Sequence, residues 1–486
     1  MVLELVVSRI AASYVGSSLY TWTVIIGVVL AGISLGSYVG GRLADRWTSS
    51  RLLSGVLVLG GLASLSLLAV NVLEPLISIR GITRENLPPI VGLAVLVIAL
   101  CFLACLILGT VSPIVAKLAV RDLNRTGRTV GQIYAAGSVG SIVGTFATGF
   151  FLISRFGTHA VVWGVGSLLI LLGLLLLPER RRLWTLLWLL LVAGGSVAAV
   201  RWGWLDGPCT RETDYFCITI REQDLNGEPV RVLVLDQMIH SYSSLDDPTV
   251  LIYGYEQFFA EATAYQAARK ERLRALFIGG GGYTLPRYME AVYPGSDLHV
   301  IEIDPGVTGV AHDMLGLSRD TQVATHNEDA RTFLKREPTG RYDLVFGDAF
   351  NSYAVPYHLT TKEFNDRVRA WLADDGLYAV NIIDGPSGHF LRAYLHTLRQ
   401  TFRHVYPVFS IDSWRQSTRS TIVILAGDTP LDLGAFQIAA PRSAPRLVSQ
   451  QEIDALLTKG PTVTLTDRYA PVDQMLLPVF LDQIPR

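Results

Sequence analysis

The first 200 residues are dominated by long runs of apolar side chains. These runs lie at about residues 21–39, 52–73, 89–111, 131–153, 159–177 and 183–200. Most of them reach the roughly 20 residues that a helix needs to cross the hydrocarbon core of a bilayer. Several such runs in series exceed what one cleaved signal peptide supplies. The pattern therefore predicts a transmembrane helical domain over residues 1–200 with six or seven spans, residues 1–19 forming a shortened or interfacial extra helix.

Glycines recur at four-residue spacing within these runs. Gly32, Gly36 and Gly40 follow this spacing early in the chain, and Gly140 and Gly144 repeat it later. Small residues on one helix face let helix backbones approach closely in lipid. A transport role would favour charged side chains within the spans, but the runs contain no lysine, arginine, aspartate or glutamate. We therefore interpret these glycines as helix-packing positions.

The second half of the chain changes to shorter alternating segments. Residues 211–242 alternate apolar and polar side chains around Asn226-Gly227, which predicts a β-hairpin. A helix is expected at about residues 249–270, followed by alternating strands and helices. That alternation is typical of a mostly parallel sheet covered on both faces. The expected strands lie at about residues 275–278, 298–303, 322–326, 344–347 and 377–383, with an antiparallel pair at 405–410 and 420–425.

These patterns divide the chain into four parts. The transmembrane domain (1–200) is followed by a β-hairpin and linking-helix region (201–270), a Rossmann-like α/β domain (271–430) and a less regular tail (431–486). The net charge changes sign near residue 200. Residues 1–200 contain 14 Lys+Arg and 6 Asp+Glu, and residues 201–486 contain 27 Lys+Arg and 36 Asp+Glu. An acidic soluble half argues against nucleic acid as a partner.

The most specific motif starts with a hydrophobic strand and a run of glycines. A helix follows the glycines, and the next strand carries Glu302, near the roughly 20-residue distance at which a carboxylate accepts hydrogen bonds from ribose hydroxyls. Glycines here allow a tight turn and a close approach of backbone to a ligand. The sequence therefore predicts a nucleotide pocket. The glycines are Gly279, Gly280, Gly281 and Gly282.

Further acidic residues follow the next expected strands. Asp329 follows the third strand, where it could bind a ligand or cap a helix. Asp348 ends the fourth strand and precedes a loop instead of a helix, a position that suits a base or a cation anchor. Ligands of open parallel sheets bind beyond the carboxyl ends of the strands. We therefore expect these acids and the glycines to share one rim.

These residues, in this order, resemble the spermidine synthase family of polyamine aminopropyltransferases, in the form fused to an N-terminal multi-span membrane domain. The resemblance covers about residues 210–425, and residues 3–46 and 466–473 are also similar to the fused members. It implies an S-adenosylmethionine-type sheet preceded by a small β-region. It also implies decarboxylated S-adenosylmethionine as co-substrate, a small-molecule amine as acceptor and no metal.

The resemblance also assigns residues to roles. Glu302 would hold the ribose, Asp329 with Ala330 the adenine, the first three glycines of the run the aminopropyl side, and Asp348 would be the base. The polyamine side departs from the family pattern. The family's loop aspartate is Gly282 here, the second aspartate of its DxxD segment is Asn351, its glutamine after the hairpin is His240, and its Tyr-x-Glu segment is displaced to Tyr253, Tyr255 and Glu256.

Three functions stay open on this basis. The first is transfer of an aminopropyl group, with His240, Tyr255 and Asn351 on the acceptor side. The second is an S-adenosylmethionine-dependent methyltransferase, which the loss of an acid at Gly282 favours. The third is a non-catalytic ligand-binding membrane protein. Since fewer carboxylates attract a polycation less strongly, the acceptor need not be putrescine. The lipid bilayer is an expected partner, and a homodimer is left open.

The orientation in the membrane is also open. Basic residues cluster in three connecting loops, 42–51, 117–128 and 180–182, and such loops stay in the cytoplasm. If every run spans once, the chain emerges at Arg201 on the outer side. Cys209 and Cys217 could close a disulfide there or remain two thiols. A re-entrant segment at 183–200 would reverse the outcome, and cytosolic adenosine cofactors favour that reversal. We expect an integral protein of a bacterial-type plasma membrane.

Overall fold

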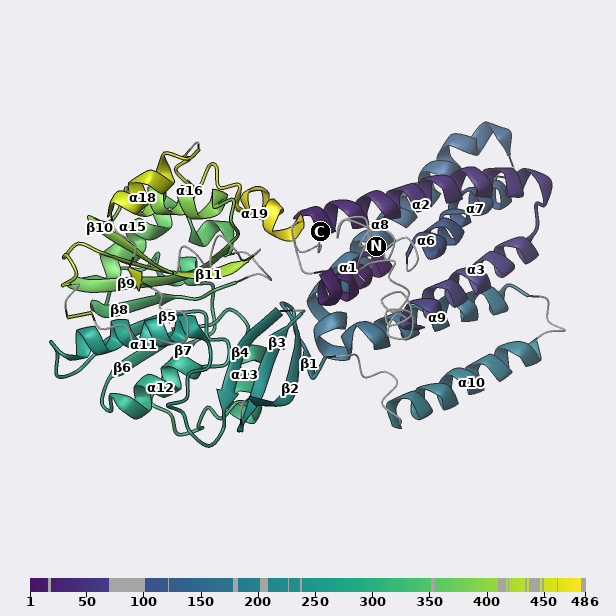
Figure 1. Cartoon of the computed structure of the whole chain (residues 1–486). Helices are drawn as coiled ribbons and strands as arrows, with labels where there is room; N and C mark the ends of the chain where they lie inside the picture. The colour runs from purple at the N-terminus through teal and green to yellow at the C-terminus, as the bar shows by residue number, and fades with distance from the viewer. Residues whose placement is uncertain are drawn as a thin grey trace. The chain divides into compact units, whose positions relative to one another are not determined.

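The computed structural model describes residues 1–15, 19–69, 101–120, 122–177, 182–201, 209–225, 227–236, 238–350, 355–409, 417, 419–432, 435–436, 446–447, 450–460 and 462–481. The chain divides into two compact units, Met1–Cys217 and Ile218–Arg486, which Figure 1 shows as a helical part and a part built around a sheet.

The first unit is helical. Its main described helices are α1 (Val2–Val15), α2 (Leu19–Arg46), α3 (Ser50–Leu65), α6 (Leu103–Gly109), α7 (Val111–Ala119), α8 (Thr126–Ala147), α9 (Ile153–Leu175) and α10 (Arg182–Arg201). Three described segments, Leu19–Arg46, Ser50–Leu68 and Thr126–Leu175, are long and apolar enough to cross a membrane. The third contains Gly157, whose φ of 77° interrupts the helix. Most of the apolar run expected at 89–111 lies outside the described residues.

The first set of spaced glycines packs helices as predicted. A Cβ on Gly36 would lie 2.1 Å from the carbonyl oxygen of Leu106, and one on Gly40 would lie 2.6 Å from the Cα of Thr110. The α2 backbone therefore lies directly against α6 and α7. The second set is divided: a Cβ on Gly144 would lie 3.1 Å from Cγ2 of Val2 on α1, whereas one on Gly140 would meet nothing within 4 Å among the described residues. Within the described part of the first unit, Gly140 therefore has no packing contact of the predicted kind.

The second unit begins with antiparallel strands. β2 (Cys217–Leu225), β3 (Glu228–Leu235) and β4 (Met238–Ser244) pair in sequence order. The turn between β2 and β3 contains Gly227 at a φ of 88°, a conformation that favours glycine, and Gly227 N donates to Oδ1 of Asp224 at 2.7 Å. The predicted hairpin is confirmed, while Asn226 lies outside the described residues.

The main sheet has eight strands in the order β12-β10-β11-β9-β8-β5-β6-β7. The strands β5 to β9 are parallel, whereas β11 pairs antiparallel with both β9 and β10. The chain thus starts at the central β5, moves outward on one side and then crosses to the other. Their bounds are β5 (Arg274–Ile278), β6 (Asp297–Ile301), β7 (Ala324–His326), β8 (Tyr342–Gly347), β9 (Leu372–Asp384), β10 (His404–Phe409), β11 (Ser420–Gly427) and β12 (Arg446–Leu447).

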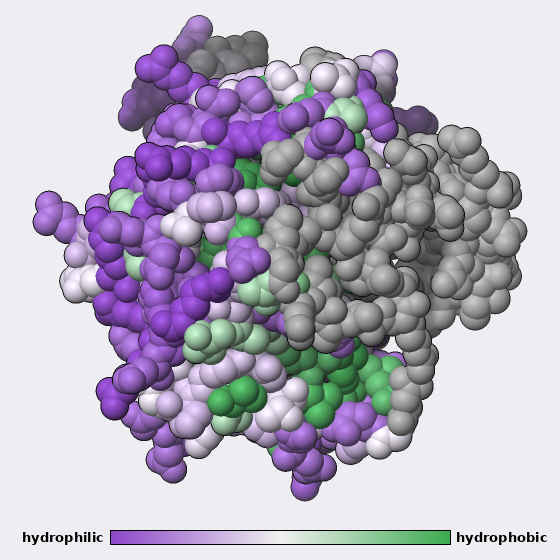
Figure 2. All heavy atoms as spheres, turned by 60° about the vertical axis from the view of Figure 1, so that its left-hand side comes forward, coloured by the Kyte–Doolittle hydropathy of each residue, from purple (hydrophilic) through white to green (hydrophobic). Residues whose placement is uncertain are grey.

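Helices cover both faces of this sheet, because its central strands are apolar on both sides. Phe277 of β5 packs in a core with side chains of α11 (Gly254–Ala267), α12 (Thr284–Val292) and α13 (Pro305–Met314). Ile278 faces the other way, into a core with α14 (Ala330–Phe333), α15 (Lys362–Trp371) and α16 (His389–Leu398). Figure 2 brings the left-hand side of Figure 1 forward, and most of the residues coloured there are hydrophilic. The second unit therefore has the layered Rossmann-like architecture expected from sequence.

Two expectations need correction. β9 begins at Leu372, five residues before the expected strand, because the chain passes directly from α15 into the sheet. The tail after residue 430 is more regular than predicted, since it forms α18 (Gln450–Leu457) and α19 (Val472–Leu481). Apolar residues of both helices, including Ile453 and Leu476, are buried in the core on the α15–α16 face. Burial against that face stabilises helices that local sequence alone specifies weakly.

Candidate active site

The glycine loop after β5 approaches the end of β8 closely. Gly279 has a φ of 100°, and a Cβ there would lie 2.4 Å from the carbonyl oxygen of Asp348. Both features require glycine. Gly281 has a φ of 48°, and Tyr283, which precedes α12, also has a positive φ of 55°. The loop therefore exposes its backbone where β5 and β8, which are neighbours in the sheet, both end.

Glu302 follows β6 and holds this loop. Its Oε2 accepts hydrogen bonds from the N–H groups of Gly280 at 2.8 Å and Gly281 at 3.4 Å, and its Oε1 accepts from Asp304 N at 2.9 Å. The side chain is buried, and burial raises its pKa although the three N–H donors oppose that shift. A carboxylate has about four acceptor sites, so Oε1 keeps one for a further hydroxyl.

Asp348, at the end of β8, is held by two donors. Its Oδ1 accepts from Asn381 Nδ2 of β9, and its Oδ2 accepts from the Tyr255 hydroxyl of α11, both at 2.9 Å. Burial raises the pKa of Asp348, and the two hydrogen bonds act in the opposite direction. The donors fix the orientation of the carboxylate and favour its ionised form.

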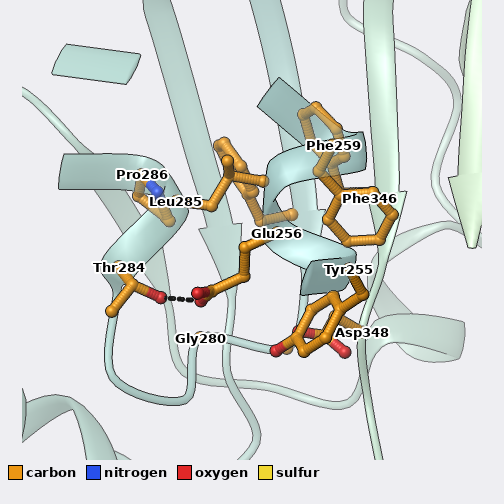
Figure 3. A pocket seen from close by; sticks show the side chains of 11 residues that line it. Tyr255, Glu256, Phe259, Gly280, Thr284, Leu285, Pro286, Phe346 and Asp348 are labelled. Carbon is orange, nitrogen blue, oxygen red and sulfur yellow. Dashed lines mark hydrogen bonds between the residues drawn. The ribbon is translucent and has the colours of Figure 1, made fainter. Parts of the chain in front are cut away.

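A second carboxylate lies beside Asp348 in the same pocket. Glu256 of α11 is 3% exposed and accepts a hydrogen bond from the Thr284 hydroxyl, as Figure 3 shows. Its Oε2 has no hydrogen-bond partner among the described residues. Burial raises the pKa of Glu256 to about 8, with the charge of Asp348 acting in the same direction. At neutral pH Glu256 therefore favours its neutral form, whereas the two hydrogen bonds to Asp348 favour the ionised form of that carboxylate against the effect of burial.

The pocket combines these polar groups with an apolar wall. It holds about 310 Å³ of empty space, its open mouth included. Figure 3 shows Tyr255 and Asp348 together on one side and the rings of Phe259 and Phe346 on another. Apolar walls lower the local dielectric constant and so strengthen interactions between charged groups inside. Its lining residues are Tyr255, Glu256, Phe259, Phe277, Gly279, Gly280, Thr284, Leu285, Pro286, Phe346 and Asp348.

Asp329 caps α14. Its Oδ1 accepts from Thr332 N at 2.8 Å, and its Oδ2 is 3.2 Å from His358 Nε2. Burial acts to raise the pKa of Asp329, but the hydrogen bonds outweigh it and lower the pKa. Asp329 is therefore the N-cap of α14, which is one of the two roles that the sequence left open for it. Ala330, the first residue of α14, is buried.

Of the two remaining predicted acceptor-side residues, the one that the structure describes is not brought into this pocket. His240 lies on β4 and does not line it, and burial lowers its pKa to about 4. Its Nε2 has no hydrogen-bond partner in the described part of the chain. Asn351 lies outside the described residues. Tyr255 is the acceptor-side residue that the structure places next to Asp348.

No protein-family model matches this chain. The polyamine aminopropyltransferase of Vibrio vulnificus is 34% identical over 110 residues, a match that spans 22% of this chain and 37% of the relative's length. Polyamine aminopropyltransferase 2 of Streptomyces coelicolor is 27% identical over 411 residues, which cover 78% of this chain and 71% of that protein. The chain is homologous to the polyamine aminopropyltransferases.

Other similarities are shorter or weaker than the match to the Streptomyces coelicolor protein. The eEF1A lysine and N-terminal methyltransferase of Bos taurus is 26% identical over 121 residues, 23% of this chain and 17% of that protein. Among solved structures, a probable spermidine synthase from Corynebacterium glutamicum superposes with a TM-score of 0.48 at 20% identity, covering 53% of this chain and 95% of that one.

The structure explains one departure from the aminopropyltransferase pattern. A Cβ on Gly282, where that pattern has aspartate, would lie 2.0 Å from the Ser241 hydroxyl oxygen and 3.0 Å from that of Ser243. Both serines are buried on β4. β4 therefore occupies the space that a side chain at residue 282 would need.

Sequence reasoning missed two residues of the site, one that lines the pocket and one that holds Asp348. Glu256 was noted only as part of a displaced segment, and Asn381 was not noted at all. A buried glutamate on a helix and an asparagine inside an apolar strand both cost free energy unless their polar atoms are hydrogen-bonded, and this was the available signal.

In the part of the chain that the structure describes, no three histidine, cysteine, aspartate or glutamate side chains are grouped to hold a metal ion.

Proposed function

We propose that the chain is an aminopropyltransferase that moves an aminopropyl group from decarboxylated S-adenosylmethionine to an amine, with Asp348 as base. The observation that carries this proposal is the position of Asp348 at the carboxyl end of a central parallel strand, beside the glycine loop and oriented by Tyr255 and Asn381. Homology to the polyamine aminopropyltransferases supports the reaction class.

The chemistry needs a base at this place. A primary amine with a pKa near 10 is almost fully protonated at neutral pH, so exposing its lone pair costs about 4 kcal/mol. An ionised Asp348 attracts the ammonium group and accepts its proton. The free nitrogen then attacks the carbon next to the sulfonium, the carbon–sulfur bond breaks, and a neutral thioether leaves. One carboxylate therefore serves both binding and activation.

The adenosyl side would be bound by the loop and the neighbouring strand ends. We assign the ribose to the acceptor site that remains on Oε1 of Glu302, the adenine to Asp329 and Ala330, and the tail of the co-substrate to Gly279, Gly280 and Gly281. The positive φ values and the lack of side chains leave the backbone of this loop accessible to a ligand.

Glu256 gives the acceptor side a second carboxyl group. The sequence did not predict this role, because Glu256 lies in a displaced form of the family's Tyr-x-Glu segment. It shares the pocket with Asp348, and one of its oxygens has no partner among the described residues. An amine in the pocket would supply that missing donor. We therefore propose that the acceptor is a small amine that reaches Asp348 and Glu256 together. An acceptor-side role for His240 and Asn351 stays a prediction from sequence.

We further propose that the first unit anchors the protein in a bacterial-type plasma membrane. Large apolar side chains are exposed along its helices, for example Leu30 of α2, Leu59 of α3 and Phe146 of α8. Such side chains suit contact with lipid. Three segments have the length and composition to span the bilayer.

The test uses the full-length protein purified in detergent. Calorimetry measures binding of decarboxylated S-adenosylmethionine and of S-adenosylmethionine, and mass spectrometry identifies products with putrescine, spermidine and monoamines. Asp348→Asn should lower turnover by roughly 100-fold or more, the range typical for loss of a general base, and leave co-substrate binding within a few-fold. Asp374→Asn, which changes a fully exposed acid, is the matched control. Unchanged turnover in Asp348→Asn would remove the base assignment.

A methyltransferase is the second candidate, because the similarity to the eEF1A lysine and N-terminal methyltransferase covers 121 residues. It would use the same adenosyl contacts but requires room for the carboxylate of S-adenosylmethionine. The same experiment separates the two: a methylated product with S-adenosylmethionine, and none with the decarboxylated form, would replace the aminopropyltransferase proposal. Binding of either compound with no product would favour the non-catalytic alternative.

A further inference from the structure

Several basic residues of the first unit lie at one end. Arg42, Arg46 and Arg51 flank the turn between α2 and α3. Lys117, near the end of α7, pairs with Asp45 of α2 at 2.8 Å between Nζ and Oδ1. The connection from α7 to α8 therefore lies at the same end as the α2–α3 turn. We call this the basic end.

α9 runs from the opposite end toward the basic end. Gly61 of α3 lies against Gly166, and Ser54, which is nearer the basic turn, lies against Gly173. Since α3 leads away from the basic turn, this pairing makes α9 antiparallel to it. α9 therefore finishes at the basic end, and the sequence that follows it contains Arg180, Arg181 and Arg182.

α10 returns from the basic end instead of re-entering it. The indole N–H of Trp188 donates to the carbonyl oxygen of Ser167 at 3.4 Å. Further along α10, Ser196 accepts from the indole N–H of Trp163 at 3.0 Å. Because higher numbers on α10 meet lower numbers on α9, the two helices are antiparallel over their length. The re-entrant alternative for residues 183–200 does not fit this register.

The segment that follows α10, residues 209–217, contacts the first unit at the end opposite the basic end. Cys209 and Cys217 form a disulfide. Between them, Glu212 Oε2 accepts from Thr158 N at 2.9 Å, at the start of the part of α9 that follows the break at Gly157. Arg9 of α1 donates to the carbonyl oxygens of Thr213 and Tyr215. The disulfide-closed segment therefore lies at the end of the unit opposite the basic end.

We propose that the helical unit crosses the membrane with its basic end in the cytoplasm, so that the disulfide-closed segment and the following sheet-containing unit lie on the non-cytoplasmic side. This inference rests on membrane insertion and not on the proposed catalytic activity.

Two independent properties support this orientation. Basic residues in short connections are retained in the cytoplasm, and two described connections of the unit, α2–α3 and α7–α8, carry them at the end where α9 also finishes. A disulfide persists in an oxidising compartment, and the disulfide lies at the other end. No run of apolar residues long enough to cross the bilayer follows Ile218, so the chain stays on the side where α10 delivers it. The adenosyl donor and the amine must then reach the site from outside the cytoplasm, which requires export of a cytosolic donor.

Cysteine labelling of the full-length protein in spheroplasts tests the orientation. The background carries Cys101→Ala and Cys105→Ala and keeps the disulfide. Glu337→Cys, at an exposed position of the second unit, is compared with Thr48→Cys, at an exposed position of the α2–α3 turn. A membrane-impermeant maleimide should label Glu337→Cys in intact spheroplasts and Thr48→Cys only after the membrane is opened.

Each other result decides against the proposal. Labelling of Thr48→Cys alone in intact spheroplasts would reverse the orientation, and labelling of neither variant until the membrane is opened would place both positions inside. Labelling of both would exclude a membrane between them. Without reductant, Cys209 and Cys217 should resist alkylation in denatured protein, and alkylation of both would remove the disulfide argument. None of these readouts uses substrate, so an inactive enzyme with outward labelling would contradict the proposed function alone.

Discussion

Tyr255 donates a hydrogen bond to Asp348 across 93 positions of sequence, with 2.9 Å between the phenolic oxygen and Oδ2. The bond joins a helix that precedes the main sheet to the end of a central strand of that sheet. It favours the ionised carboxylate against the effect of burial. The proton affinity of the proposed base is thus set partly by a residue outside the sheet.

Removing this bond should shift the pH dependence of the reaction. In Tyr255→Phe the pKa of Asp348 rises, so the acidic limb of the kcat/KM profile moves to higher pH by about one unit, as expected for loss of one hydrogen bond to a charged group. Activity then falls about tenfold at pH values below the limb and recovers as pH rises. Tyr253→Phe is the control, because the Tyr253 hydroxyl donates to the carbonyl oxygen of Ile239. Identical profiles for both variants would show that Tyr255 does not tune the base.

Glu256 should make stability depend on pH. Its pKa in the folded state is about 8, above the ordinary 4.5, so the folded protein binds this proton more tightly. The resulting stabilisation is complete below about pH 4.5 and is lost as pH rises through about 8. Glu256→Gln, which cannot ionise, should therefore melt at a higher temperature than the unchanged protein at pH 8. The difference should shrink toward pH 5. Glu337→Gln, at an exposed position, is the control; a constant difference across this range would contradict the assignment.

A side chain at residue 282 should destabilise the second unit. Gly282→Ala places a Cβ against the hydroxyl of Ser241, and overpacking of this kind costs about 1–3 kcal/mol. Ser241→Gly should restore most of the loss in the double variant, since it removes the clashing atoms. Gly254→Ala has open space and serves as control. Thermal unfolding of the unchanged protein, the two single variants, the double variant and the control measures the effect, and an additive double variant would show that the two residues do not clash.

The glycines of α2 allow an equally direct comparison. Gly36→Ala puts a Cβ 2.1 Å from the carbonyl oxygen of Leu106, whereas Gly41→Ala on the same helix meets nothing within 4 Å. We expect Gly36→Ala to lower the melting temperature of the detergent-solubilised protein. Gly41→Ala should leave it unchanged or raise it, because alanine favours helix by about 1 kcal/mol over glycine. Equal effects would show that α2 does not pack on α6 through Gly36.

The sequence located the glycine loop, Glu302 and Asp348 correctly at strand ends because local pattern and chain order suffice for this. A strand followed by glycines and a strand followed by an acid are local features, and parallel strands deliver their carboxyl ends to one rim. The hairpin at Gly227 and the packing at Gly36 followed from local pattern in the same way. The spacing predicted a packing role for Gly140 as well, but Gly140 has no such contact among the described residues. Spacing alone does not say which helix face meets a neighbour.

Contacts between distant segments depended on tertiary structure. Whether Glu256 enters the pocket depends on the rotation of α11 above the sheet, and the need for glycine at residue 282 depends on β4 lying against the loop. The tail helices form because they bury Ile453 and Leu476 against the sheet unit. The sequence by itself determined which segments are helices and strands and which ends carry acids, because periodicity and chain order are local. The folded structure decided which side chains share a pocket and which end of the helical unit holds the disulfide, because only packing fixes distances between residues far apart in the chain.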